Sequence, residues 1–494
     1  MILFLVLHIA DWFSSMRRLI VNFAIFPYLL ALGVCASAAN YPTCACLDYI
    51  AKSDMKAATK ECNKNLKDAQ RSGNKAQIAI AKNNIGMMLF RQGDYIKAEE
   101  FFRFALVMSQ EANGPEHPYV TIPMSNLSVL YLRNKKIDEG GLLLEKSSKI
   151  VQKYFGDKPS QFKVGVLDAA VAYNIYKKSF VDAARDAEEI VELNQLLYGG
   201  ESTKVAEANL LLSMVYEKSG NHELQLKYAK VAVDIYRKIN DLRGKALALV
   251  DVSDALLYLG KTQDALQESQ LAVEILKAAP VVSAQDRIRV NSGLAMAYLA
   301  MNQLDEALSY YTTALRYCDA KSGADVDNIF AIEERRAFVK YKMKNYDEAA
   351  IIYLRAYDLY PKTSKFSAFV ARDLVERLVS SLMRSKNYIK ALVYFDHLLD
   401  FQREILGRDH ITVGYTLGQK GIALGNLKRW GETEEAMQEA LSILKRNNAS
   451  SAHQIAVIDW LIIAANALGK KDEVRKFIGA QEILRKSEEV TNSP

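Results

Sequence analysis

One pattern returns along most of this chain at nearly constant intervals. In its clearest copy, Gly86 is followed by a chain-reversing turn at Gly93 and then by Ala98, Phe102 and Ala105. The small side chains allow two antiparallel helices to approach closely, the large ones fill the space between them, and glycine interrupts the helix at the turn. The residues that open the second helix of each predicted pair are Ala98, Gly140, Ala183, Gln225, Ala265, Ala307, Ala349, Ala391 and Thr433. Their regular spacing predicts a stack of helical hairpins.

This pattern resembles the tetratricopeptide repeat, specifically the 42-residue variety of kinesin light chains and their many bacterial relatives. That subclass often places a Gly-Asx-His-Pro-like turn between repeats, and residues 114–118 (Gly-Pro-Glu-His-Pro) and 407–410 (Gly-Arg-Asp-His) are similar to it. The resemblance covers residues 44–486. It implies an all-α fold, a right-handed superhelical solenoid of about 10–11 antiparallel helix pairs.

The repeat register also divides the chain. We expect a degenerate first repeat with cysteines in residues 39–74, nine repeats in 75–446, an atypical capping helix pair in 447–486 and a disordered tail in 487–494. Terminal repeats depart from the pattern because one of their faces meets water. No span is left for a separate catalytic domain.

Residues 1–38 have the features of a signal peptide of an exported bacterial protein. From Met16, which is a possible true start, a basic pair precedes an apolar stretch over residues 19–34 and then Ala36-Ser37-Ala38, which is similar to a cleavage site. We therefore expect export to the periplasm or secretion.

Two other readings of this leader stay open. Residues 32–35 (Leu-Gly-Val-Cys) resemble a lipoprotein box, although valine stands where a small residue normally precedes the cysteine. An uncleaved membrane anchor over residues 19–39 is the other reading, although the apolar stretch is short against the ~20 residues of a spanning helix.

Cysteines are concentrated in the first repeat. In the repeat register, Cys46 takes the small position of the first helix and Cys62 the aromatic position of the second, so the two sites face each other. A disulfide there would close a loop of ~15 residues and stabilise the folded state by ~3 kcal/mol. Cys44 could replace Cys46, and the alternative is that the cysteines are buried as small apolar residues. We assign no role to Cys318.

Charge and motifs exclude several classes of function. The formal net charge of +6 is small for 494 residues, and basic residues are spread along helices beside acidic ones. Nucleic-acid binders concentrate basic charge on one face, so we expect no nucleic-acid partner. The chain has no phosphate-binding loop, Gly-x-Ser-x-Gly elbow, His-Glu-x-x-His or dinucleotide fingerprint. We expect no enzyme, no catalytic residues, no metal, no cofactor and no small-molecule substrate.

The resemblance implies that the first helix of each repeat lines a concave groove, where the family's asparagines often clamp a bound peptide. Apolar side chains interleaved with Arg and Asn suit an extended peptide. The predicted partner-binding residues are Asn83, Met87, Phe90, Arg91, Ser125, Val129, Leu132, Arg133, Ile175 and Tyr176. The alternative is that curvature buries part of this stripe against the neighbouring repeat.

These observations favour a non-enzymatic scaffold, exported to the cell envelope, that binds a peptide or protein in its groove. The alternative is a peptide-responsive regulator whose superhelix changes pitch when the peptide binds. We expect the protein to contact a membrane only if its N-terminal segment is not cleaved.

Overall fold

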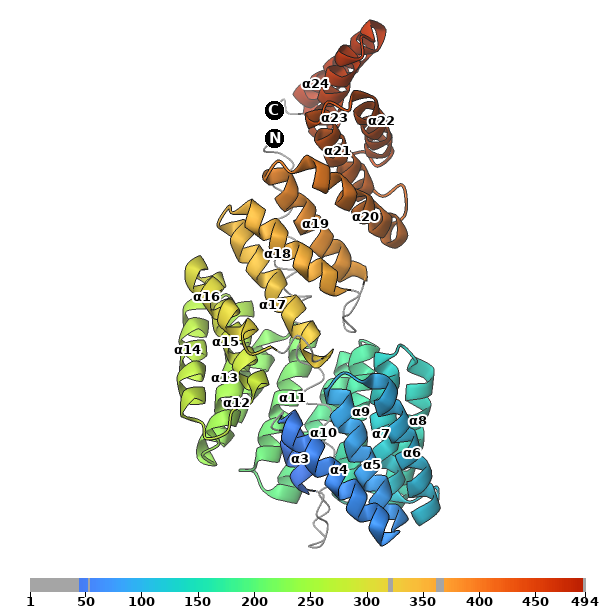
Figure 1. Ribbon diagram of the computed structural model, residues 1–494, viewed down its shortest axis with the longest axis vertical. Coiled ribbons are helices and arrows are strands. Elements are labelled where there is room, and N and C mark those ends of the chain that lie inside the picture. The colour runs from blue at the N-terminus through green and yellow to red at the C-terminus, as the bar shows by residue number, and fades with distance from the viewer. Residues whose placement is uncertain (1–43, 52–53, 319–322, 361–367, 492–494) are drawn as a thin grey trace. The chain divides into compact units, whose positions relative to one another are not determined.

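The computed structural model describes residues 44–51, 54–318, 323–360 and 368–491. These residues form 22 α-helices, α3–α24, and no strand (Figure 1). Consecutive helices pair as hairpins, which gives eleven pairs and confirms the predicted all-α solenoid class. The predicted leader, with its cleavage, lipidation and anchor readings, lies outside the described residues.

The chain divides into two compact units, which we treat separately. The N-terminal unit (described from residue 44 to 329) contains the pairs α3 (Cys44–Ala51) and α4 (Met55–Ser72), α5 (Lys75–Arg91) and α6 (Tyr95–Asn113), α7 (Thr121–Arg133) and α8 (Ile137–Phe155), α9 (Gln161–Tyr176) and α10 (Phe180–Tyr198), α11 (Thr203–Ser219) and α12 (His222–Lys238), α13 (Leu242–Tyr258) and α14 (Thr262–Ala278), and α15 (Ala284–Ala300) and α16 (Leu304–Leu315). A short 3-10 turn, η2 (Pro118–Val120), precedes α7.

Helix α17 (Gly323–Lys342) begins in the N-terminal unit and continues into the C-terminal unit (residues 330–494). That second unit contains α18 (Tyr346–Leu359), α19 (Ala368–Arg384) and α20 (Tyr388–Leu406), α21 (Ile411–Asn426) and α22 (Trp430–Arg446), and α23 (Ser451–Ala467) and α24 (Lys471–Thr491). The nine pairs from α5 to α22 thus run from Lys75 to Arg446.

The C-terminal helix differs from the expectation. We predicted a disordered tail from residue 487, but α24 continues to Thr491. Residues 487–491 contain neither glycine nor proline, and the first proline after them is Pro494, so no residue there interrupts the helix.

The turn within each of the nine repeats depends on one residue with left-handed backbone conformation. It lies five positions before the residue that opens the second helix, as Gly93 does with φ 82° before Ala98. Five repeats have lysine there, and Lys135 and Lys178 both have φ 60°. The position recurs because a tight turn between antiparallel helices requires it, even where a side chain makes that conformation unfavourable.

Small residues allow the two helices of a pair to pack closely. A Cβ atom on Gly86 of α5 would lie 2.7 Å from Cδ1 and Cε1 of Phe102, which is fully buried in α6. Consecutive pairs also approach closely, because a Cβ on Gly244 of α13 would lie 2.3 Å from Cε1 of Tyr236 in α12. The repeat therefore needs a small residue wherever an aromatic ring crosses.

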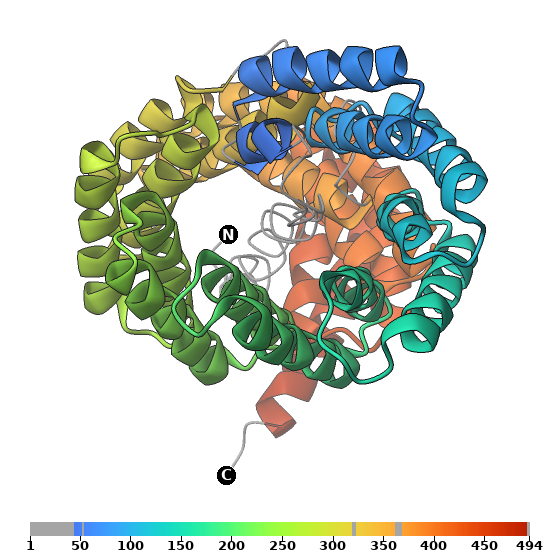
Figure 2. The same ribbon diagram turned by 90° about the horizontal axis from the view of Figure 1, so that it is seen from below.

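Packing between pairs gives the N-terminal unit its curvature. First helices of successive pairs pack against each other, as α7 does against α9 and α13 against α15, whereas contact between successive second helices is weaker. First helices therefore line the inner side of the arc and second helices its outer side (Figure 2). We call the inner side of residues 44–329 the inner face.

Among the described helices, none combines the length and the apolar character that a membrane crossing requires.

Candidate functional site

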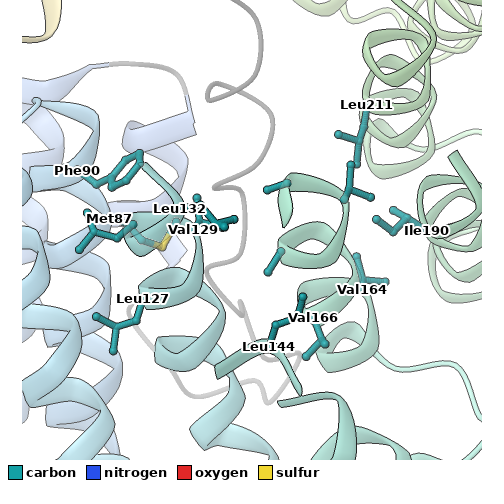
Figure 3. Packing of buried hydrophobic residues seen from close by; sticks show 14 of the residues in the cluster. Met87, Phe90, Leu127, Val129, Leu132, Leu144, Val164, Val166, Ile190 and Leu211 are labelled. Carbon is teal, nitrogen blue, oxygen red and sulfur yellow. The ribbon is translucent and has the colours of Figure 1, made fainter. Parts of the chain in front are cut away.

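Most of the predicted partner-binding residues lie in the core between helices. Seven of them are buried: Asn83, Met87, Phe90, Ser125, Val129, Leu132 and Ile175. Met87, Val129 and Leu132 belong to one apolar cluster (Figure 3). Burial of these seven side chains against neighbouring helices corresponds to the second of the two expectations, in which part of the stripe is packed away. Arg91 and Arg133 are half-buried, and Tyr176 is 41% exposed.

Buried amide and hydroxyl groups cross from α5 to α7. Asn126 Nδ2 donates a hydrogen bond of 2.8 Å to Oδ1 of Asn83, and Asn83 Nδ2 lies 3.7 Å from the Met87 sulfur. Nδ2 of Asn84 and Oγ of Ser125 are also buried, and neither has a hydrogen-bond partner among the described residues. A buried polar group without a partner costs about 1–3 kcal/mol, so these two atoms lower the stability of the packing between α5 and α7.

Arg91 connects distant parts of the inner face. Burial lowers the pKa of its guanidinium to about 10, the charge of Glu207 opposes this shift, and the charge of Arg243 adds to it. Glu207 lies in α11 and Arg243 in α13, three and four pairs further along the chain. The arc therefore brings residues from non-consecutive repeats within electrostatic range of one another.

Arg133 is held in a similar way. Its guanidinium carbon lies 4.0 Å from the centre of the Tyr95 ring, which is a cation–π contact. Burial lowers the pKa of Arg133, while Tyr95 and Asp327 of α17 raise it. Both predicted arginines are thus placed at the inner face beside groups from other helices.

The sequence prediction missed three charged residues of the inner face, and Asp168 in α9 is the first. Burial raises the pKa of Asp168 to about 8, Lys204 opposes the shift, and Glu207 adds to it. Asp168 holds the same place relative to Ala183 that Asn83 holds relative to Ala98. Repeat register alone could therefore have identified Asp168.

The other two form an ion pair that joins successive first helices. Arg243 of α13 donates to both carboxylate oxygens of Asp286 in α15, from Nε at 2.7 Å and from Nη2 at 2.8 Å. Asp286 is buried and also completes a capping box with Ser283 at the start of α15. The 43-residue separation of the pair is one repeat, which is a signal that the sequence contains but that we did not use.

The structure joins Cys46 of α3 and Cys62 of α4 by a disulfide, with Cα atoms 5.0 Å apart. These are the two cysteines that the repeat register places opposite each other. Both side chains are fully buried.

Comparison with protein families finds the tetratricopeptide repeat. One model of that family matches residues 77–153 and 286–362, and a second matches residues 376–412.

Two curated proteins are similar over part of the chain. A clustered mitochondria protein homolog of Xenopus tropicalis is 24% identical over 194 residues, and the RxLR effector protein SFI4 of Phytophthora infestans is 26% identical over 197 residues. Each match covers 39% of this chain, but only 15% of the first protein and 57% of the second.

Solved structures with similarity include the apo form of RapI, at 15% identity and a TM-score of 0.44, which covers 71% of this chain and 99% of that one. The apo quorum sensor NprR from B. thuringiensis has 14% identity and a TM-score of 0.43, with 74% and 97% covered. A signal transduction ATPase with a tetratricopeptide-repeat sensor from Pyrococcus horikoshii has 16% identity and a TM-score of 0.45, with 72% and 53% covered.

Proposed function

Since this chain is a tetratricopeptide-repeat protein, we propose that it is a non-enzymatic scaffold that holds a peptide or protein segment on its inner face. The observation that carries the proposal is the inner face itself, where Arg91 and Arg133 are half-buried and Tyr176 is 41% exposed on the first helices of successive repeats. An extended peptide has backbone groups that need amide or hydroxyl partners and side chains that need apolar neighbours.

The curvature of the N-terminal unit supports the same proposal. Arg91 lies within electrostatic range of Glu207 and Arg243, so a segment that passes beside Arg91 would meet at least three first helices. Recognition by several repeats at once gives specificity to an extended surface.

We extend the proposal to export. Its supports are the leader-like residues 1–38, with Met16 as a possible start, and the disulfide between Cys46 and Cys62, since disulfides persist mainly in oxidising compartments. The alternative is that the leader is not cleaved and that residues 19–39 anchor the protein in the membrane.

The proposal is tested by crosslinking a tagged full-length chain in its native cell and identifying what is captured. Intact mass and N-terminal sequence from the same sample report whether the leader is removed near Ala39. A double variant that combines Arg91→Glu with Arg133→Glu should abolish capture of the partner. The control variant Arg237→Glu, on the outer helix α12, should leave capture unchanged. Undiminished capture by the double inner-face variant would refute the assignment of the inner face.

A peptide-responsive regulator is the second candidate function, and the interactions of Arg91 favour it. Because Glu207 and Arg243 belong to repeats three and four pairs away, a ligand that separates these charges would alter the curvature of the unit. Solution scattering distinguishes the two functions. A change in the radius of gyration when a captured peptide is added supports the regulator, and unchanged dimensions support the passive scaffold.

A further inference from the structure

Two carboxylates interrupt the apolar pattern of the inner face. In the repeat register, the position of Asp254 is held by Met, Val, Ala, Phe, Ser or Ile in the other eight copies. The position of Glu217, almost one helical turn further along, is held by Phe, Leu, Ile, Tyr, Met or Gly in the others. Glu217 lies in α11 and Asp254 in α13, so the two exceptions fall in neighbouring repeats.

The charges around Asp254 do not balance. Lys218 Nζ lies 3.3 Å from Oε1 of Glu217, with both side chains nearly inaccessible, and Arg289 of α15 pairs with Asp251 one turn before Asp254. Neither of these two ion pairs includes Asp254, which is the third carboxylate of the group. Its Oδ1 is buried and has no hydrogen-bond partner among the described residues.

This imbalance perturbs Asp254 itself. Burial, and then the charges of Asp251 and Glu217, raise its pKa well above the usual value, and Arg289 and Lys218 oppose this only in part. Burial and the two neighbouring carboxylates disfavour the ionised form of Asp254, and a further cation supplied from outside would reduce that cost.

We propose that Asp254 binds one lysine or arginine side chain of the segment held on the inner face. The inference rests on the proposed scaffold function and assigns it a chemical class of partner: a cationic residue between apolar ones. The neighbours suit this choice, because Met214 is buried and Leu257 half-buried beside the carboxylates, where the alkyl stem of a lysine or arginine packs well. Among the described residues, no group of three His, Cys, Asp or Glu side chains could hold a metal ion, which favours an organic cation.

A display library of random dodecapeptides, selected on the immobilised full-length chain, tests the inference. Peptides selected by the wild type should share a lysine or arginine at one position between apolar residues. The Asp254→Asn variant should lose that preference and keep the apolar ones. The matched control is Asp264→Asn, at an exposed aspartate on the next helix, α14, and it should select the same peptides as the wild type.

The outcomes separate the two proposals. If the wild type selects peptides without a cationic preference, or if Asp254→Asn keeps that preference, the role of Asp254 is wrong and the scaffold function stands. If no peptide is selected, or if Arg91→Glu and Arg133→Glu do not weaken the peptides that are, the inner-face scaffold fails and the inference fails with it.

Affinity gives a readout that a purely structural role would not change. Replacing the shared lysine by norleucine should weaken binding to the wild type by about 10- to 100-fold, which is the range of a charge-assisted hydrogen bond, and should leave binding to Asp254→Asn unchanged. Because the ligand cation favours the ionised carboxylate, wild-type affinity should rise with pH until Asp254 is fully ionised, and the variant should lack this rise. The other charged groups facing Asp254 are Glu217, Lys218, Asp251 and Arg289. A wild-type affinity that is flat with pH and unaffected by norleucine would overturn the proposal.

Discussion

Reduction of the disulfide between Cys46 and Cys62 should release the first helix pair without unfolding the rest of the chain. The cysteines are 16 residues apart in sequence and lie in α3 and α4. Closing a loop of this length stabilises the folded hairpin by ~3 kcal/mol in the chain-entropy model. Helix α3 has only eight residues and packs mainly on α4, with a smaller contact to α5, so it has little other tertiary support.

Hydrogen exchange measures this directly. A loss of ~3 kcal/mol corresponds to roughly a 10²-fold increase in the exchange rate of amides that open with the pair. We expect that increase in peptides from α3 and α4 when a phosphine reductant is added, or in the Cys46→Ala/Cys62→Ala variant under oxidising conditions. Peptides from α21 and α22 should keep their wild-type rates, because each repeat of a solenoid contacts only its neighbours.

Two results would refute this reasoning. If exchange in α3 and α4 stays the same after complete reduction, the disulfide does not limit opening of the pair. If all helices exchange faster together, the chain unfolds as one cooperative unit and the nearest-neighbour description is wrong.

Two further predictions concern packing and pH. In urea titrations, Gly86→Ala should lower the free energy of unfolding by about 1–3 kcal/mol, because its Cβ would overlap the buried ring of Phe102. Gly479→Ala in α24 should raise the free energy of unfolding by up to about 1 kcal/mol, because a Cβ there meets no atom within 4 Å. Equal effects of the two substitutions would contradict the close-approach argument. Burial raises the pKa of Asp168 to about 8, so between about pH 4 and pH 8 the folded chain keeps a proton that the unfolded chain has lost, and stability should fall as pH rises through that window. Urea midpoints at several pH values should show this slope in the wild type and a smaller slope in Asp168→Asn, and identical slopes would show that Asp168 does not carry it.

The repeat pattern was sufficient to predict the fold class. Small residues such as Gly86, the turn at Gly93 and the spacing of second-helix starts are local requirements of a helical hairpin, and each is visible in one stretch of sequence. The number of helix pairs followed from that spacing. The extension of α24 to Thr491 was missed because a weak repeat gives no signal for where its last helix ends.

The site was predicted less well than the fold. The register correctly placed Arg91 and Arg133 on the first helices, but it did not distinguish a side chain that faces the inside of the arc from one that is packed against the next repeat. Nothing in the repeat pattern shows that the carboxylates of Asp168 and Asp254 are buried. Burial depends on how tightly successive pairs pack, which no single repeat specifies.

The sequence by itself determined that the chain is a stack of helix pairs and where each pair turns, because these features depend on residues within one hairpin. Only the tertiary structure decided that Arg91 lies within electrostatic range of Glu207, three pairs away, and that the buried Oδ1 of Asp254 has no hydrogen-bond partner among the described residues. Curvature is the sum of small rotations between neighbouring pairs. The distances between non-consecutive repeats are therefore set only when the pairs stack, and these distances determine the electrostatics of the inner face.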